Sequence, residues 1–165
     1  MHKLGAVLVL AAALALPVTA SADKPIKSPS PFGTVDVPAG VVCPFEMLWE
    51  SPVDKNFQNV HLDKAGNVLW IWGGGNNVAR ITNEANGKVF VTNTTGPGKI
   101  TFGDDGSLTI DGTGHWLVGY GPSDSPPSSM LFYSGHIVLH VTADGTLSLV
   151  SYNGAAPVDV CAAIA

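Results

Sequence analysis

The stretch Val68-Leu69-Trp70-Ile71-Trp72, followed by Gly73-Gly74-Gly75, is the most apolar run beyond the N-terminal segment. Side chains of a β-strand alternate between its two faces, so Trp70 and Trp72 share one face and Ile71 points to the other. Both faces are apolar, which is typical of a strand covered on both sides. The glycines allow a sharp bend, because no Cβ restricts their backbone. The run predicts a central strand on which other strands are built.

Short apolar runs recur on both sides of this stretch at intervals of about ten residues, which is typical of an all-β sandwich or barrel. The turns between them place glycine late in a short polar loop, as in Asp63-Lys64-Ala65-Gly66-Asn67 and Gly103-Asp104-Asp105-Gly106. Glycine there supplies the positive φ of a hairpin turn. We therefore expect an antiparallel meander of about ten strands. The expected strands after Pro52 cover residues 57–62, 68–72, 78–82, 88–92, 99–102, 108–110, 115–120, 130–133, 136–142 and 147–151.

The N-terminus reads as a secretory signal peptide over residues 1–22. Met1-His2-Lys3 is basic, residues 4–16 are apolar, and Ala20-Ser21-Ala22 supplies the small residues that a signal peptidase needs. Residues 23–34 are rich in proline and predict a flexible, exposed tail. Residues 35–165 have the length of a single domain. We expect an exported, extracellular protein with one β domain.

Cys43 and Cys161 are the two cysteines of the chain. An isolated pair in an oxidising compartment is most simply a disulfide, since neither its spacing nor its number suits a zinc or redox site. Because the bond would enclose most of the domain, it would stabilise the fold by up to about 5 kcal/mol. A half-buried strand is expected from Val41 to Pro52 and carries Cys43. Residues 157–163 predict a short helical turn that brings Cys161 back to this first strand. This return favours a barrel over an open sandwich.

The chain carries a formal net charge of −5 at pH 7, and its few basic residues are scattered. Nucleic acids and anionic lipid surfaces both require clustered Lys and Arg, so neither is expected as a partner. No apolar run after the signal peptide is long enough for a bilayer helix, so we expect no membrane insertion after cleavage. The sequence indicates no oligomeric state.

Three short segments are similar to a family of small exported β-rich proteins from actinobacteria. They are Val37-Pro38-Ala39-Gly40-Val41-Val42-Cys43-Pro44-Phe45, Asp111-Gly112-Thr113-Gly114-His115 and Asp159-Val160-Cys161-Ala162-Ala163. The resemblance runs over most of residues 35–163. It implies export, a disulfide and an all-β domain, and because the family has no assigned activity it implies no site residue.

Trp70 and Trp72 are candidate ligand-binding residues. A row of exposed tryptophans can stack on sugar rings, with Asn76 and Asn77 as a polar rim. The alternative is that the rings fill a core, as most aromatic residues do in small β domains. Two further tryptophans could join the row across strands, namely Trp49 and Trp116.

Tyr120 and Tyr133 flank the loop at residues 121–129, which is rich in proline and serine. We expect this loop at the rim of the sheet, where such segments often carry function. The two tyrosines are therefore a second candidate for a pocket lip, with a place between core and water as the alternative.

No catalytic residue, metal site or cofactor is expected. His136 and His140 share a strand face, but four strand residues separate their Cα atoms by about 13 Å, too far for one ion. The chain has no G-x-S-x-G nucleophile elbow, and Gly73-Gly74-Gly75 lacks the Lys of a phosphate loop.

These observations together predict a secreted, non-catalytic binding protein that holds a small apolar or sugar-like ligand. The alternative is a structural or interaction module at the cell surface or wall, which would use its sheet edges for contacts.

Overall fold

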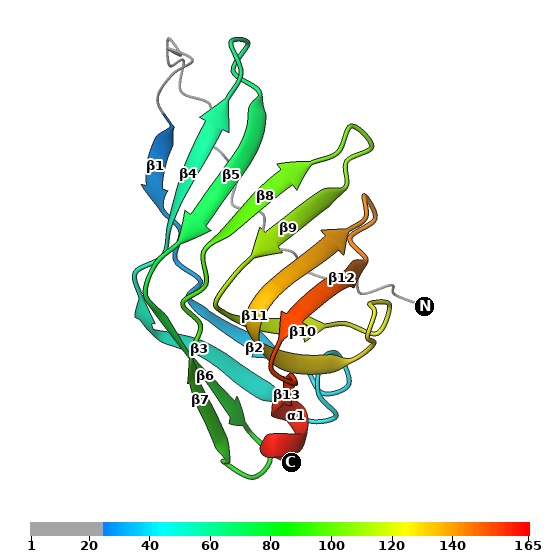
Figure 1. The fold of residues 1–165 in the computed structure, drawn as a ribbon. Helices are drawn as coiled ribbons and strands as arrows, with labels where there is room; N and C mark the ends of the chain where they lie inside the picture. The colour runs from blue at the N-terminus through cyan, green and yellow to red at the C-terminus, as the bar shows by residue number, and fades with distance from the viewer. Residues whose placement is uncertain (1–24) are drawn as a thin grey trace.

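The computed structural model describes residues 25–165, and nearly all of them lie in β-strands or the turns between them (Figure 1). The short helical turn α1 (Val160–Ala163) follows the last strand, as predicted. The strands are β1 (Ile26–Pro29), β2 (Thr34–Val37), β3 (Met47–Asp54), β4 (Phe57–Leu62), β5 (Val68–Gly74), β6 (Asn77–Asn83), β7 (Val89–Asn93), β8 (Gly98–Phe102), β9 (Leu108–Gly112), β10 (His115–Tyr120), β11 (Ser129–Val141), β12 (Leu147–Gly154) and β13 (Val158–Asp159).

The strands form two antiparallel sheets. The larger sheet has nine strands in the order β1-β4-β5-β8-β9-β11-β10, with β12 and β13 also paired to β11, and the smaller sheet has the order β2-β3-β6-β7. The all-β prediction is confirmed. Within residues 25–165 neither sheet returns to its first strand, so the architecture is the sandwich-like alternative and not the preferred closed barrel. The chain end does return towards Cys43, but it does so by pairing β13 with β11 and not by closing the sheet.

Four connections carry the chain from one sheet directly into the other, from β1 to β2, β3 to β4, β5 to β6 and β7 to β8. We call this level of the molecule the crossover (Figure 1). Gly75 makes the bend between β5 and β6, as its place after the apolar run predicted. Its φ is +150°, and a Cβ there would lie 2.4 Å from the carbonyl oxygen of Lys55. Only glycine lets the two crossing chains come this close.

Strand β11 differs from the sequence prediction. A two-residue turn at Ser134-Gly135 was expected between two strands, but β11 runs unbroken through both residues. It pairs with β10 before Gly135 and with β9 and β12 after it. Gly135 has a φ of +151°, and a Cβ there would lie 2.3 Å from the carbonyl oxygen of Asn153. The glycine therefore bends one long strand and does not end it.

The buried side chains form two clusters. The first joins the smaller sheet to α1 and contains the disulfide, and its members include Met47, Ile81, Met130, Val160 and Ile164. The second lies where β10, β11 and β12 meet, and its members are Val118, Tyr120, Tyr133, Ile137 and Leu139. The sheet half formed by β1, β4, β5 and β8 contributes no residue to either buried set.

The predicted disulfide joins Cys43 to Cys161, whose Cα atoms lie 5.5 Å apart. Asp159 is the N-cap of helix α1, and its carboxylate accepts a hydrogen bond from the backbone N–H of Ala162 at 3.0 Å. The buried side chain of Asn83 donates to the carbonyl oxygen of Ile164 at 2.8 Å. The disulfide is typical of a protein from an oxidising compartment.

The proline-rich segment contributes to the larger sheet. Residues 23–34 were expected to form a tail, yet β1 pairs with β4 from Ile26 opposite Val60 to Pro29 opposite Phe57. An edge strand tolerates proline because one side of it needs no hydrogen bonds. The predicted signal peptide at residues 1–22 lies outside the described residues. Between residues 25 and 165, no helix is long and apolar enough to cross a membrane.

Candidate functional site

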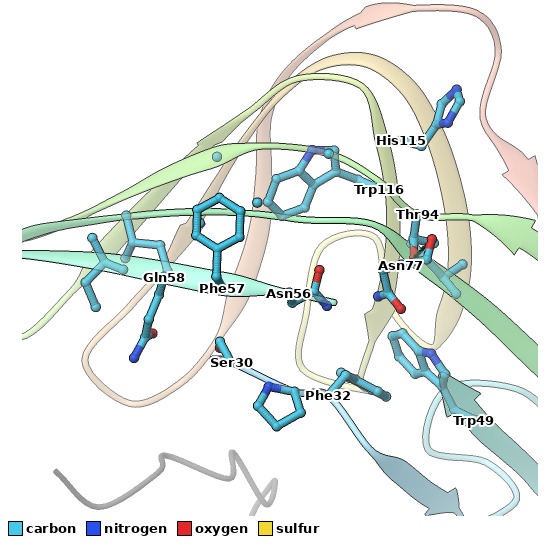
Figure 2. Close-up of a pocket in the computed structure, with 18 residues that line it drawn as sticks. Ser30, Phe32, Trp49, Asn56, Phe57, Gln58, Asn77, Thr94, His115 and Trp116 are labelled. Atoms are coloured by element: carbon cyan, nitrogen blue, oxygen red, sulfur yellow. Dashed lines mark hydrogen bonds between the residues drawn. The ribbon is translucent and has the colours of Figure 1, made fainter. Parts of the chain in front are cut away.

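A pocket of about 370 Å³ lies at the crossover, between the larger sheet and the adjacent end of the smaller one. Its walls come from the connections that pass between the sheets and from the facing strands β5, β8 and β10 (Figure 2). The residues that line it are Ser30, Pro31, Phe32, Trp49, Asn56, Phe57, Gln58, Ile71, Gly73, Gly74, Asn77, Thr94, Gly96, Gly98, Ile100, His115, Trp116 and Leu117.

Trp116 forms one wall because glycines leave room for its indole ring. Gly98 and Gly112 lie directly opposite each other on β8 and β9. A Cβ at Gly98 would lie 2.7 Å from the ring, and one at Gly112 would lie 2.4 Å from it. The indole N–H donates to the carbonyl oxygen of Thr113 at 3.0 Å. The ring is therefore held flat against the sheet.

Two other aromatic residues form the opposite wall. Trp49 comes from β3 in the smaller sheet and packs against Phe32, with 4.6 Å between the ring centroids. Phe32 itself lies in the connection between β1 and β2. In Figure 2 the Trp49 and Trp116 rings stand on opposite sides of the pocket, with Asn56 and Asn77 between them. The pocket is thus an apolar space with amide groups near its centre.

Most of these amide groups already have partners. The side-chain N–H of Asn56 donates to Asp54 at 3.0 Å, and that of Gln58 donates to Ser28 at 3.3 Å. Asn77 is different, because its side-chain oxygen is buried and accepts no hydrogen bond. This oxygen is closed off from solvent and therefore from a ligand, whereas the side-chain oxygens of Asn56 and Gln58 remain as acceptors at the pocket because the bonds above use only their N–H groups.

The pocket carries little charge. Of the lining residues, all of which fall within residues 25–165, none is Asp, Glu, Lys or Arg. His115 is the titratable side chain among them, and its ring packs against Phe132 with 5.6 Å between centroids. Figure 2 shows His115 pointing away from the space between Phe57 and Trp116. The lining therefore suits an uncharged molecule, because no lining side chain that faces this space would neutralise an ion.

Trp70 and Trp72, the tryptophans expected to bind a ligand, lie on the other face of β5. Ile71 lines the pocket instead. Trp70 stacks on His61 with 3.4 Å between ring centroids, and the Lys99 ammonium lies 5.0 Å from the Trp70 ring. Trp72 packs against Phe57 and is 37% exposed. The two indoles do share a face, as alternation predicted, but they are not in the pocket.

Tyr120 and Tyr133, proposed as a second lip, lie inside the second core cluster. Both side chains are buried, and their hydroxyls lie 3.0 Å apart. Burial, together with the hydrogen bond to Tyr133, raises the pKa of the Tyr120 phenol. The adjoining loop is tied down by Asp124, which accepts hydrogen bonds from the N–H groups of Gly121 at 2.6 Å and Leu147 at 2.8 Å. The structure does not bring these tyrosines together with Trp70 and Trp72.

The two histidines of β11 each have a different neighbour. His136 lies 2.8 Å from a carboxylate oxygen of Asp111, and His140 lies 3.5 Å from the hydroxyl of Thr109. No group of three or more His, Cys, Asp or Glu side chains suited to a metal ion is found in the described part of the chain.

Sequence reasoning found part of this pocket. Trp49, Trp116 and Asn77 were named as members of an aromatic and amide cluster, although in company with Trp70 and Trp72. Phe32 and Phe57 were missed. Phe32 is an isolated aromatic residue in a proline-rich segment that shows no regular hydrophobic pattern, and this isolation could have marked it as a binding residue. Nothing in the alternation of β4 distinguishes Phe57 in this way.

Comparison with known proteins places no further constraint on this site, since no family model, curated protein or solved structure matches the chain.

Proposed function

We propose that this chain is a secreted, non-catalytic binding protein whose crossover pocket holds a small, uncharged and mainly apolar ligand. The observation that carries the proposal is the pairing of aromatic walls with amide acceptors, the side-chain oxygens of Asn56 and Gln58. Apolar walls supply affinity through burial, and a few polar groups orient the ligand. The volume of about 370 Å³ lies within the range of small-molecule sites.

An apolar ligand with a hydroxyl group is favoured over a free sugar. The walls of the pocket are mainly apolar, so a free sugar would leave water without gaining the burial of apolar surface. The hydrogen bonds of Asn56 and Gln58 use their side-chain N–H groups, so their side-chain oxygens remain as acceptors for hydroxyl groups of a ligand. A hydroxylated group on an otherwise apolar molecule matches this arrangement.

Secretion and the lack of catalysis are part of the same proposal. The signal-like sequence at residues 1–22 and the disulfide both support export. The pocket lining contains His115 as its titratable group, and no lining residue carries a carboxylate. The intact mass of the protein recovered from culture medium would reveal cleavage after Ala22, the oxidised disulfide and any retained ligand.

The pocket can be tested with the neutral apolar dye N-phenyl-1-naphthylamine, whose fluorescence rises on entering an apolar site. A Cβ at Gly73 would meet only the carbonyl oxygen of Phe57, at 3.7 Å, so a side chain there would grow into open pocket space. We expect Gly73→Val to weaken dye binding about tenfold or more, since it removes the space for apolar contact. The matched control is Thr101→Val, on the opposite sheet face beside Trp70.

Equal dye affinity in Gly73→Val and in the wild type, with both variants folded, would contradict the pocket as the binding site. Thermal melts of both variants are needed to exclude unfolding as the cause of a loss.

The cell-surface module remains the second candidate, and one observation favours it. Strand β7 is an edge strand that pairs only with β6 among the described strands, and it exposes Val89 and Val91. Such an edge can add a strand from a partner. Binding to intact cells that is lost in Val91→Lys, without any binding of the dye, would support this function over the pocket.

A further inference from the structure

One face of the larger sheet carries a straight row of aliphatic side chains. Residues that lie directly opposite each other in antiparallel strands point to the same face. From β1 to β11, every residue paired along this line is aliphatic. We call the set the aliphatic row: Ile26, Val60, Ile71, Ile100, Ile110 and Leu139. A row this regular is expected to be covered along its whole length.

The row is covered at only one end. Leu139 on β11 is 3% exposed, because it belongs to the second core cluster. Ile26 on β1 is 45% exposed. In Figure 1 the smaller sheet lies at one end of β4 and β5, and the rest of these two strands extends beyond it. In the part of the row on β1, β4, β5 and β8, Ile26 is exposed and Val60, Ile71 and Ile100 are half-buried, so this part is a partly covered apolar strip, which we call the open half.

The open half continues directly into the pocket. Ile71 and Ile100 face each other in the row, and both also line the pocket. Phe102, two residues beyond Ile100 on the same face of β8, adds a ring that is 46% exposed. A molecule that fills the pocket could thus extend along the open half without leaving apolar surface.

We infer that the ligand is a single-chain, non-ionic amphiphile, with a hydroxylated head in the crossover pocket and an alkyl tail along the open half. This inference rests on the proposed function. The head is uncharged because the lining offers no Asp, Glu, Lys or Arg, and it carries hydroxyl groups because the side-chain oxygens of Asn56 and Gln58 can accept hydrogen bonds. A fatty acid would bring a carboxylate that no lining cation neutralises.

The strip sets the length of the tail. From β8 to β1 the row crosses three strand spacings of about 4.8 Å, roughly 14 Å in all, which an extended alkyl chain of about twelve carbons would cover. Because the strip covers only one side of the tail, each added methylene would tighten binding about twofold, half of the full burial effect on a logarithmic scale.

A chain-length series of alkyl glucosides tests the inference. Hexyl, octyl, decyl and dodecyl glucosides, kept below their micelle concentrations, would be titrated against the intact protein by competition with the neutral dye. We expect affinity to rise about twofold per methylene up to dodecyl. Free glucose is expected to leave the dye in place, as are dodecyl chains with a sulfate or trimethylammonium head at equal concentration.

Variants separate the tail from the head. Ile26→Gln changes the far end of the row, and we expect it to weaken dodecyl glucoside about threefold and leave hexyl glucoside unchanged. Val150→Gln on β12 is the matched control, because Val150 is also an exposed β-branched residue of a strand, 61% exposed, and belongs neither to the row nor to the pocket lining. It should change neither affinity.

The outcomes distinguish this inference from the proposed function. Dye binding that is sensitive to Gly73→Val, combined with equal affinities for hexyl and dodecyl glucosides, would overturn the tail and keep the pocket. Dye affinity that is unchanged in Gly73→Val would contradict both the proposed pocket and the inferred tail site. A wild-type dimer in sedimentation equilibrium that Ile26→Gln dissociates would show that a second copy covers the strip, and would also overturn the inference.

Discussion

At the scale of single residues, the burial of Tyr120 and Tyr133 makes the stability of the protein depend on pH. Their side chains are almost fully buried, and each hydroxyl has the other as its hydrogen-bond partner at 3.0 Å. Burial raises the pKa of both phenols above the ordinary value of 10.0. A phenolate would have to form inside an apolar cluster, so the neutral form is strongly preferred in the folded state.

We therefore predict that stability falls in alkaline solution. The pKa is raised in the folded state, so the unfolded chain loses its phenol protons first. The free energy of unfolding should be fully retained below about pH 10 and should decrease as the pH rises further. Urea unfolding followed at several alkaline pH values measures this. Replacing both tyrosines, as Tyr120→Phe with Tyr133→Phe, should flatten the dependence, and an equally steep decrease in that double variant would contradict the assignment.

At the scale of the elements, a line of three glycines decides how Trp116 of β10 packs over β8 and β9, which belong to the same sheet. Gly73, Gly98 and Gly112 lie opposite one another across β5, β8 and β9. The indole of Trp116 covers Gly98 and Gly112, while the space over Gly73 stays open and belongs to the pocket. The line of glycines thus makes room both for the Trp116 indole, which forms one wall of the pocket, and for a ligand beside it.

We expect Gly112→Ala to destabilise the protein by about 2 kcal/mol, because a methyl group there would overlap the Trp116 ring. Gly73→Ala is the matched control, since its new Cβ makes an ordinary contact at 3.7 Å. Chemical unfolding of the two variants checks this. A loss in Gly112→Ala no greater than that in Gly73→Ala would mean that the indole moves aside freely.

At the scale of the whole molecule, the disulfide holds the chain end against the start of the smaller sheet. It joins residues separated by 118 positions and lies in the first core cluster beside Met47 and Ile81. Asn83 adds a hydrogen bond to the carbonyl oxygen of Ile164 from the same sheet. The two sheets share this anchor because β13 also pairs with β11 of the larger sheet.

Removing the cross-link as Cys43→Ser with Cys161→Ser should lower the free energy of unfolding by about 3 to 5 kcal/mol, because the unfolded chain gains the freedom that the long loop denied it. Urea unfolding of the variant measures the loss, and the reduced wild-type protein serves as the comparison. A decrease below about 1 kcal/mol would contradict this stabilising role of the cross-link.

Local patterns were sufficient for the elements of this protein. Alternation and turn glycines located most strands to within a few residues, and β4 and β10 match their predicted bounds. The pairing of Cys43 with Cys161 and the turn of α1 also followed from the residues themselves. Ser134-Gly135 was the exception, because a glycine that bends a strand and a glycine that ends one look alike in sequence.

The site depended on contacts between segments far apart in the chain. Alternation placed Trp70 and Trp72 on one face of β5 and Ile71 on the other, but it could not indicate which face the smaller sheet and β10 approach. That choice follows from the four crossings between the sheets and from the glycines that admit Trp116. Side-chain alternation is a property of each strand, whereas a pocket is made by the positions of several strands relative to one another, and those are set by long-range packing.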